Sequence, residues 1–354
     1  MPGDNKMDLK ADIVSPSELS ESDIAAWNGF ISEFPDLSVA FLSHPYALAA
    51  EKSFPNVRVC RVRHNDRPVI FFPFQFRSLA HRWFGIGERL AGELSDYFGI
   101  VGEKTARIDP RTLLRLSGLK ALLFTHLDES QSAFGLSGEA PEPGHLIDFP
   151  SGGAVFWQER RLLDKKFVVD TERRERNLVR DFGPIRFHFQ SADTDADLEK
   201  LVGAKREQYA RTETGDALQG RSTNAFLRSL SKTDHPLCSG ILSTLYAGDT
   251  WVASHFGLRC NRTLHYWFPV YNPQLASYGP GRLLLRQVLN SGNEYGISRV
   301  DRGAGDTVAK RDFSTSQHHF LRGLWSRGGG AAMGYRATLS AKWRLGSIAA
   351  PRHP

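Results

Sequence analysis

The stretch YNPQLASYGPGRLLLRQVL, residues 271–289, joins the end of an apolar run to the start of a helix, because leucine and valine recur at helical spacing after Gly279-Pro280-Gly281. Proline is tolerated at the first helical position, where its nitrogen needs no intrahelical partner, and glycine on each side lets a ligand approach the backbone. The amides at a helix start and the positive end of the helix dipole favour a phosphate, and Arg282 adds a charged donor. We therefore predict an anion-binding turn.

The segments before this turn indicate a layered α/β arrangement. Residues 195–212 and 222–230 have helical patterns, and residues 238–271 are typical of three strands joined by turns at Gly248-Asp249 and Asn261-Arg262. The first half of the chain shows the same order. Two helical patterns at 20–35 and 44–55 precede two strand-like runs separated by Asn65-Asp66.

This repetition predicts a duplicated unit of helices packed on a largely antiparallel sheet. A charged, helical connector ending at Gly183-Pro184 separates the halves. We predict an N-terminal extension (1–24), an N-terminal domain (25–155), a helical connector (156–184), a C-terminal domain (185–330) and a basic tail (331–354).

Composition limits the classes of function. The three cysteines of the 354-residue chain are too few and too scattered for a disulfide framework or a Cys-x-x-Cys metal site. No window approaches the about 18 apolar residues of a membrane span, and the N-terminus has no signal-peptide pattern, so we expect a cytoplasmic protein. The net charge of +6 favours acidic partners, but no zinc-finger spacing or RNA-binding aromatic signature favours nucleic acid.

Residues 251–313 resemble the C-terminal domain of the CelD/BcsL-type acyltransferases, which have a GNAT-like fold and are similar to the FemAB aminoacyl transferases. The resemblance is carried by Tyr271-Asn272-Pro273, the Gly-Pro-Gly turn before a leucine-rich helix, Asp301 at the end of the next strand, and the glycine loop that leads to Lys310 and Phe313. Asp96-Tyr97 is similar to an Asp-Tyr pair in the family's N-terminal domain. The likeness implies tandem GNAT-like domains with mixed, largely antiparallel sheets flanked by helices.

The resemblance implies an acyltransferase that uses acetyl-CoA or another acyl-CoA as donor, with an amine or hydroxyl acceptor and no metal. It implies that Tyr278, Gly279, Gly281 and Arg282 hold the pyrophosphate of the donor. The turn departs from the usual pattern at Ala276, where an Arg or Gln is common, and at Pro280, which removes an amide donor. Ala309 also replaces the tyrosine that the family more often has beside the lysine.

Acyl transfer requires a base for the incoming nucleophile, and histidine is the first candidate because its pKa lies near neutrality. His255 and His265 lie on the two strands before the turn, and Asp301 closes the next strand, so all three are candidates to line one cleft. An exposed histidine at 265 and a simple arginine partner at 301 are the structural alternatives, because strand faces are not fixed without the hairpin register. The predicted catalytic residues are His255, Asp301 and Lys310, and the predicted substrate-binding residues are Asp96, Tyr97 and Tyr266.

Partners and alternatives follow from the same features. We expect a small-molecule or glycan-precursor acceptor, as in exopolysaccharide or cell-envelope synthesis. An acyl carrier protein or an anionic membrane surface is a candidate partner of the basic tail. The alternatives are a FemAB-like transferase that uses aminoacyl-tRNA, and a non-catalytic GNAT-like partner of a polysaccharide assembly. Stabilisation by coenzyme A distinguishes them.

Overall fold

The computed structural model describes residues 9–328, which form two compact units. Within the described residues, unit 1 comprises 9–142 and 319–328, and unit 2 comprises 143–318. Within residues 9–328, the chain therefore leaves unit 1 after Glu142 and returns to it at His319, in the last described strand. The predicted connector folds as two helices of unit 2, whereas the predicted tail, 331–354, lies outside the described residues.

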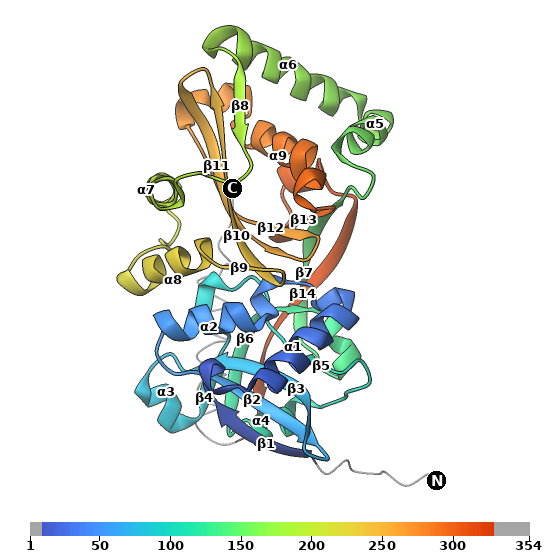
Figure 1. The fold of residues 1–354 in the computed structure, drawn as a ribbon, viewed down its shortest axis with the longest axis vertical. Coiled ribbons are helices and arrows are strands. Elements are labelled where there is room, and N and C mark those ends of the chain that lie inside the picture. Colours follow the sequence, from blue (N-terminus) through green and yellow to red (C-terminus); the bar gives the residue numbers. More distant parts are fainter. Residues whose placement is uncertain (1–8, 329–354) are drawn as a thin grey trace. The chain divides into compact units, whose positions relative to one another are not determined.

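In its described residues, unit 1 combines a mixed sheet with helices α1 to α4 (Figure 1). Its sheet order is β1-β2-β3-β4-β6-β14, with β5 paired to β3 and with β4 and β6 parallel. The helices are α1 (Glu21–Glu33), α2 (His44–Ser53), α3 (Leu79–Phe84) and α4 (Pro110–Leu116). The strands are β1 (Leu9–Val14), β2 (Val57–His64), β3 (Arg67–Gln75), β4 (Ile86–Glu88), β5 (Val101–Gly102), β6 (Ala121–Asp128) and β14 (Ser316–Ser326), which enters from unit 2.

Local signals explain the elements of unit 1. Ser20 caps α1 by accepting the Asp23 N–H, and Ser43 caps α2 in front of a proline at the start of the helix. Asn65 and Asp66 both have positive φ angles, 50° and 60°, which allows the tight β2–β3 hairpin. The helices and hairpin predicted from the sequence are confirmed.

Unit 2 has the sheet order β7-β13-β12-β11-β10-β8, with β9 paired to β10. All of its recorded strand pairs are antiparallel except β12 with β13. The strands are β7 (Glu139–Asp148), β8 (Ile185–His188), β9 (Asp234–His235), β10 (Cys238–Ala247), β11 (Thr250–Cys260), β12 (Thr263–Tyr271) and β13 (Arg299–Ala304). The helices are α5 (Gly153–Leu163), α6 (Lys165–Phe182), α7 (Thr194–Arg211), α8 (Arg221–Ser231), α9 (Pro280–Ser291) and α10 (Val308–Arg311).

The helices of unit 2 cover both faces of its sheet. Helices α7 and α8 pack on one side of the β10–β12 meander, and α9 packs on the other (Figure 1). The α9 side holds the main core of the unit, formed by α5, α6, α9 and the strands beneath them. No helix within residues 9–328 is long and apolar enough to cross a membrane.

Candidate functional site

The parallel strands β12 and β13 pair only over their first residues. The pairs run from Thr263↔Arg299 to His265↔Asp301, although β12 continues to Tyr271 and β13 to Ala304. Beyond His265 the recorded pairing of β12 is with β11 alone. A parallel pair that separates in this way leaves backbone N–H and C=O groups of β12 outside the ladder on one edge.

A β-bulge in β12 follows directly after His265. The β11–β12 register passes from Phe256↔Phe268 to Leu258↔His265, which is two steps in β11 and three in β12. Gly257 lies opposite the extra residue, and a Cβ there would be 2.2 Å from the His265 carbonyl oxygen and 2.4 Å from His255 Nε2. Only glycine therefore fits opposite the bulge, which reverses the side-chain alternation along β12.

His265 and Asp301 form a buried pair at the point where the strands part. The distance between His265 Nδ1 and Asp301 Oδ2 is 2.9 Å, and the Gly303 N–H donates to Asp301 Oδ1 at 2.7 Å. The two residues are 3% and 1% exposed. Burial alone would raise the pKa of Asp301, but the charge and hydrogen bond of His265 hold it far below its ordinary value. Because the ionised carboxylate only accepts, His265 Nδ1 carries a proton.

His255 occupies the opposite face of the sheet, the face that α9 covers. Its ring stacks on Tyr266 with centroids 4.0 Å apart and an interplanar angle of 5°, and the Arg302 guanidinium lies 5.3 Å from the centre of Tyr266. Within the described residues, neither His255 nitrogen nor the Tyr266 hydroxyl has a hydrogen-bond partner. Burial, with the nearby charges of His265 and Arg302, lowers the pKa of His255 to about 3. Burial raises the pKa of Tyr266.

The structure thus brings together His265 and Asp301 and separates them from His255. Side-chain alternation places Tyr266 on the face of His255. Tyr266, a predicted substrate-binding residue, therefore lies on the face opposite to His265. Lys310 is buried at the end of β13, where its Nζ donates to the Gly303 carbonyl at 3.2 Å and to the Ala304 carbonyl. Lys310 therefore holds the loop that follows Asp301.

The turn before α9 has the predicted form. Gly279 has a φ of 65°, Pro280 is the first helical residue, and a Cβ at Gly281 would meet nothing within 4 Å. Because the helix begins at Pro280, the Gly281 N–H has no intrahelical acceptor. The turn accordingly offers an open backbone surface at the positive end of a helix.

Side chains of α6 surround this turn. Arg174 donates from Nη1 to the Ser277 carbonyl at 2.6 Å and lies beside Gly279. Arg282 is held by Asp170 at 3.0 Å, with its guanidinium 4.6 Å from the centre of Phe167. The Tyr278 hydroxyl donates to Asp181 at 2.8 Å. Tyr278 and Arg282, which we predicted to contact the pyrophosphate, are therefore hydrogen-bonded to side chains of α6. Gly279 and Gly281 contribute only backbone groups to the turn.

Comparison with known proteins identifies the domain that contains these residues. Residues 167–311 match the acetyltransferase (GNAT) domain model. The match begins in α6 and ends in α10, so it includes the α9 turn, the bulge and the His265–Asp301 pair. No curated protein sequence matches the chain.

Solved structures resemble most of the chain at low identity. The C-terminal domain of a putative lysylphosphatidylglycerol synthetase from Agrobacterium fabrum is 11% identical with a TM-score of 0.54, and the likeness covers 93% of this chain and 98% of that one. FemX is 8% identical with a TM-score of 0.57, covering 87% and 96%. A tandem GNAT protein from the clavulanic acid biosynthesis pathway is 11% identical with a TM-score of 0.48, covering 91% and 99%. The predicted mixed α/β fold class is confirmed.

Two predicted site residues lie outside the GNAT domain match, in unit 1. The Tyr97 ring is 5% exposed and packs between Phe41, at 6.1 Å, and Phe320, at 4.9 Å, measured between centroids. Asp96 is half-buried and lies near the buried Arg89 guanidinium. The Tyr97 ring therefore belongs to the aromatic core of unit 1.

Lys205 is a buried cation of the GNAT domain that was not predicted from the sequence. Lys205 of α7 is 1% exposed, and its Nζ donates to the Pro269 carbonyl of β12 at 3.0 Å and to Gln208 Oε1 at 3.2 Å. Burial lowers the pKa of Lys205 to about 8. The available signal was its spacing, because Lys205 follows Leu198 and Leu201 on the buried face of the helix.

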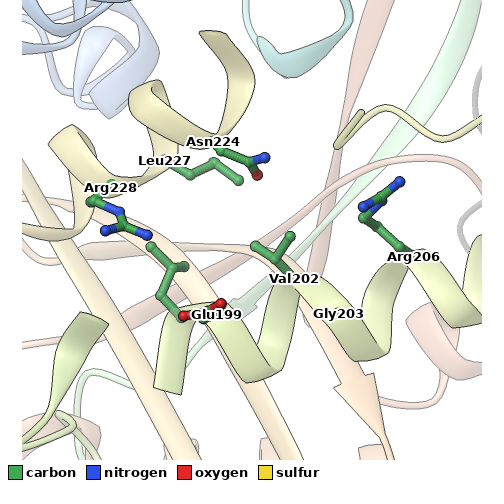
Figure 2. A pocket seen from close by; sticks show the side chains of 8 residues that line it. Glu199, Val202, Gly203, Arg206, Asn224, Leu227 and Arg228 are labelled. Carbon is green, nitrogen blue, oxygen red and sulfur yellow. The ribbon is translucent and has the colours of Figure 1, made fainter. Parts of the chain in front are cut away.

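Two cavities of about 300 Å³ flank α7. Figure 2 shows the groove between α7 and α8, with Leu227 and Val202 between Arg228 and Glu199 at one end and Arg206 at the other. The second cavity lies between α7 and strands β10 and β11. Among the described residues, no group of three or more His, Cys, Asp or Glu side chains is arranged to hold a metal ion.

Proposed function

We propose that the GNAT domain is an acyltransferase that moves an acyl group, acetyl being the first candidate, from a coenzyme A thioester to an amine or hydroxyl. The observation that carries the proposal is the buried His265–Asp301 pair at the point where β12 and β13 separate, within the residues that match the GNAT model. A separated parallel pair, a bulge and a helix start then lie in sequence along one segment, 263–282.

The chemistry assigned to His265 is proton transfer. An amine or hydroxyl that attacks an acyl carbon must lose a proton, and a positioned histidine contributes about 10²–10⁴-fold to such a step. Asp301 accepts from Nδ1 and so directs the basic lone pair to Nε2. Asp301 remains ionised throughout, which stabilises the imidazolium that forms when His265 takes the proton.

The residues present fit an acyl-CoA donor, which supplies an acyl group activated as a thioester. The open space at Gly281 admits a pyrophosphate to the backbone, and the Gly281 N–H and the helix dipole favour its charge. Arg174 adds a cation beside the turn, although Asp170 partly offsets it. The bulge at Tyr266–Trp267 leaves a backbone amide outside the ladder, and such an amide is the kind of donor that stabilises an oxyanion.

The test combines binding with turnover. We expect coenzyme A to raise the melting temperature, because a ligand at 100 times its Kd stabilises the folded state by about 2.7 kcal/mol. We expect His265→Gln and Asp301→Asn to lower kcat with acetyl-CoA and a panel of amine and hydroxyl acceptors by about 10²-fold or more. The stabilisation by coenzyme A should remain. The control is His319→Gln, a half-exposed histidine of unit 1 that contacts Glu129.

Two results would contradict the proposal. One is an unchanged melting temperature with every coenzyme A thioester tried. If aminoacyl-tRNA raised the melting temperature instead, aminoacyl-tRNA would be the donor. The other is normal turnover per folded molecule in His265→Gln, which would return the pair to a structural role.

A further inference from the structure

The cavity between α7 and the β10–β11 hairpin is separate from the proposed acyl-transfer site. We call it the Trp251 pocket, and its lining includes Thr244, Tyr246, Trp251 and Ser254 of the strands and Asp197 and Lys200 of α7. Ser254 pairs with Val270 of β12, five residues beyond His265. At about 3.3 Å per residue, the pocket is roughly 15 Å along the strands from His265. Neither the GNAT match nor the proposed function requires it.

Two buried hydroxyls form the floor of the pocket. Thr244 and Ser254 are 2% and 5% exposed, and their oxygens lie 3.1 Å apart. The Trp251 indole N–H donates to Ser254 Oγ at 2.9 Å. The two hydroxyls have two protons and share one hydrogen bond, so whichever of them donates, one proton has no acceptor among residues 9–328. The floor therefore offers a hydrogen-bond donor to whatever enters the pocket.

Aromatic rings form its walls. Trp251 and Tyr246 are both half-buried, and both line the cavity. The Arg186 guanidinium lies 5.9 Å from the centre of the Tyr246 ring, and His188 meets the same ring edge-on at 6.4 Å, so β8 holds Tyr246 in place. The small side chain of Ala204 on α7 completes the lining. Rings held in this way provide flat apolar surfaces at little cost in conformational entropy.

The rim is balanced in charge. Asp197 accepts the Ser191 hydroxyl at 2.6 Å, and Lys200 Nζ lies 3.8 Å from its other carboxylate oxygen. An isolated anion gains little from such a rim, because the carboxylate opposes the ammonium. An acyl chain is disfavoured because it would cover the two hydroxyls of the floor without replacing their hydrogen bonds. The volume of about 300 Å³ is at the lower limit of ligand pockets, about 300–1,000 Å³, which suits a single ring.

We propose that the Trp251 pocket binds a sugar ring. A pyranose has an apolar C–H face for Trp251 or Tyr246 and a rim of hydroxyls that both donate and accept, which matches the floor and the Asp197–Lys200 edge. The α7–α8 groove of Figure 2 lacks this combination, because its lining has no aromatic residue and its polar side chains are exposed. The sugar site stands on these contacts alone and is independent of acyl transfer.

The test uses the full chain and three probes, glucose, galactose and N-acetylglucosamine. Saturation-transfer NMR and tryptophan fluorescence measure their binding. We expect at least one sugar to bind saturably in the millimolar range. Trp251→Ala and Thr244→Val should each weaken that binding tenfold or more, and Trp251→Phe should weaken it less because it keeps a ring. Thr244→Val is nearly isosteric, so it preserves the test if Trp251→Ala does not fold.

Matched controls are Trp83→Ala, which removes a tryptophan that is 85% exposed in unit 1, and Asn224→Ala in the α7–α8 groove. Both should bind the sugar as the wild type does. The proposal is overturned if none of the three sugars binds, or if binding is the same in Thr244→Val and Trp251→Ala as in the wild type. It is also overturned if decanoate or inorganic phosphate binds and these substitutions weaken that binding, while no sugar binds.

Discussion

His255 and His265 lie on adjacent strands, yet their surroundings give them opposite properties. His255 is stacked on Tyr266 in the core, and burial favours its neutral form. His265 is instead oriented by a hydrogen bond from Nδ1 to the ionised carboxylate of Asp301. This oriented contact is the reason that we propose His265 as the base, although both residues are buried.

The neutral state of His255 predicts a specific acid sensitivity. Its folded pKa of about 3 is below its ordinary value of 6.5, so between these values the unfolded chain binds a proton that the folded chain does not. Stability should therefore fall as the pH falls from 6.5 towards 3, by about 1.4 kcal/mol per pH unit from this residue. His255→Phe keeps the stack on Tyr266 and should remove that part of the slope. Urea unfolding at pH 7, 6 and 5 measures it, and equal slopes in both proteins would contradict the assignment.

Lys205 predicts a change in the same direction at alkaline pH, because its folded pKa is also below its ordinary value. Its folded pKa of about 8 is below its ordinary value of 10.5, so in this window the unfolded chain binds more protons and the stability of the wild type should rise with pH. The expected gain from this residue is about 1.4 kcal/mol per pH unit. In Lys205→Met the gain should disappear. Lys200→Met, an exposed lysine of the same helix, should keep the wild-type slope when unfolding is measured from pH 8 to 10.

At the scale of the element, the register of the β11–β12 hairpin separates the two histidines, because His265 lies opposite Leu258 and His255 is three residues from Leu258 along β11. From the sequence, the strands, both turns of the meander and the start of α9 could be predicted, because each has a local signal. The faces could not be predicted, because they depend on the hairpin register, and the extra residue at 266–267 shifts the alternation in the rest of β12 without a signature of its own. Gly257 is the one trace of it in the sequence, and its meaning depends on a register that only the folded sheet fixes.

The bulge predicts that Gly257 tolerates no side chain. In Gly257→Ala the new Cβ would be 2.2 Å from the His265 carbonyl oxygen, so the bulge must shift. We expect a loss of about 2 kcal/mol or more in the free energy of unfolding. Turnover per folded molecule should fall as well, because His265 moves. Gly203→Ala in the middle of α7, where a Cβ meets nothing within 4 Å, should instead stabilise the protein by up to about 1 kcal/mol.

The α9 turn predicts a variant that folds well and binds poorly. Gly281→Val meets no neighbour within 4 Å of the new Cβ, so the free energy of unfolding should change by less than about 1 kcal/mol. The branched side chain should nevertheless block close approach of a pyrophosphate to the backbone and abolish most of the stabilisation by coenzyme A. Calorimetric titration measures this, with Gly203→Val as the control. Unchanged affinity in Gly281→Val would move the donor away from this turn.

At the scale of the molecule, the path of the chain differs from a simple tandem of domains. The repeated order of helices and strands could be predicted from the sequence, because this order depends on local patterns. The return of the chain to unit 1 after His318 could not be predicted, because strand pairing between residues about 200 apart has no local signal. Residues 320–326 complete the sheet of unit 1 by pairing with β6, and this gives the end of the described chain a structural role in its first unit.

This return predicts how two shortened chains will differ. A chain that ends at residue 328 keeps Trp325, whose ring is 4.5 Å from Phe124 between centroids and whose indole N–H donates to the Ser137 carbonyl at 2.8 Å. A chain that ends at residue 318 loses this ring and Phe320, which packs on Tyr97. Removing a buried aromatic side chain costs about 3–5 kcal/mol, and two such losses approach the whole stability of a domain, about 5–15 kcal/mol. We therefore expect the amides of β2 and β3 to lose protection from hydrogen exchange in the shorter chain and to keep it in the longer one. Because residues 329–354 are absent from both, the comparison isolates β14, and equal protection in the two chains would show that unit 1 folds without it.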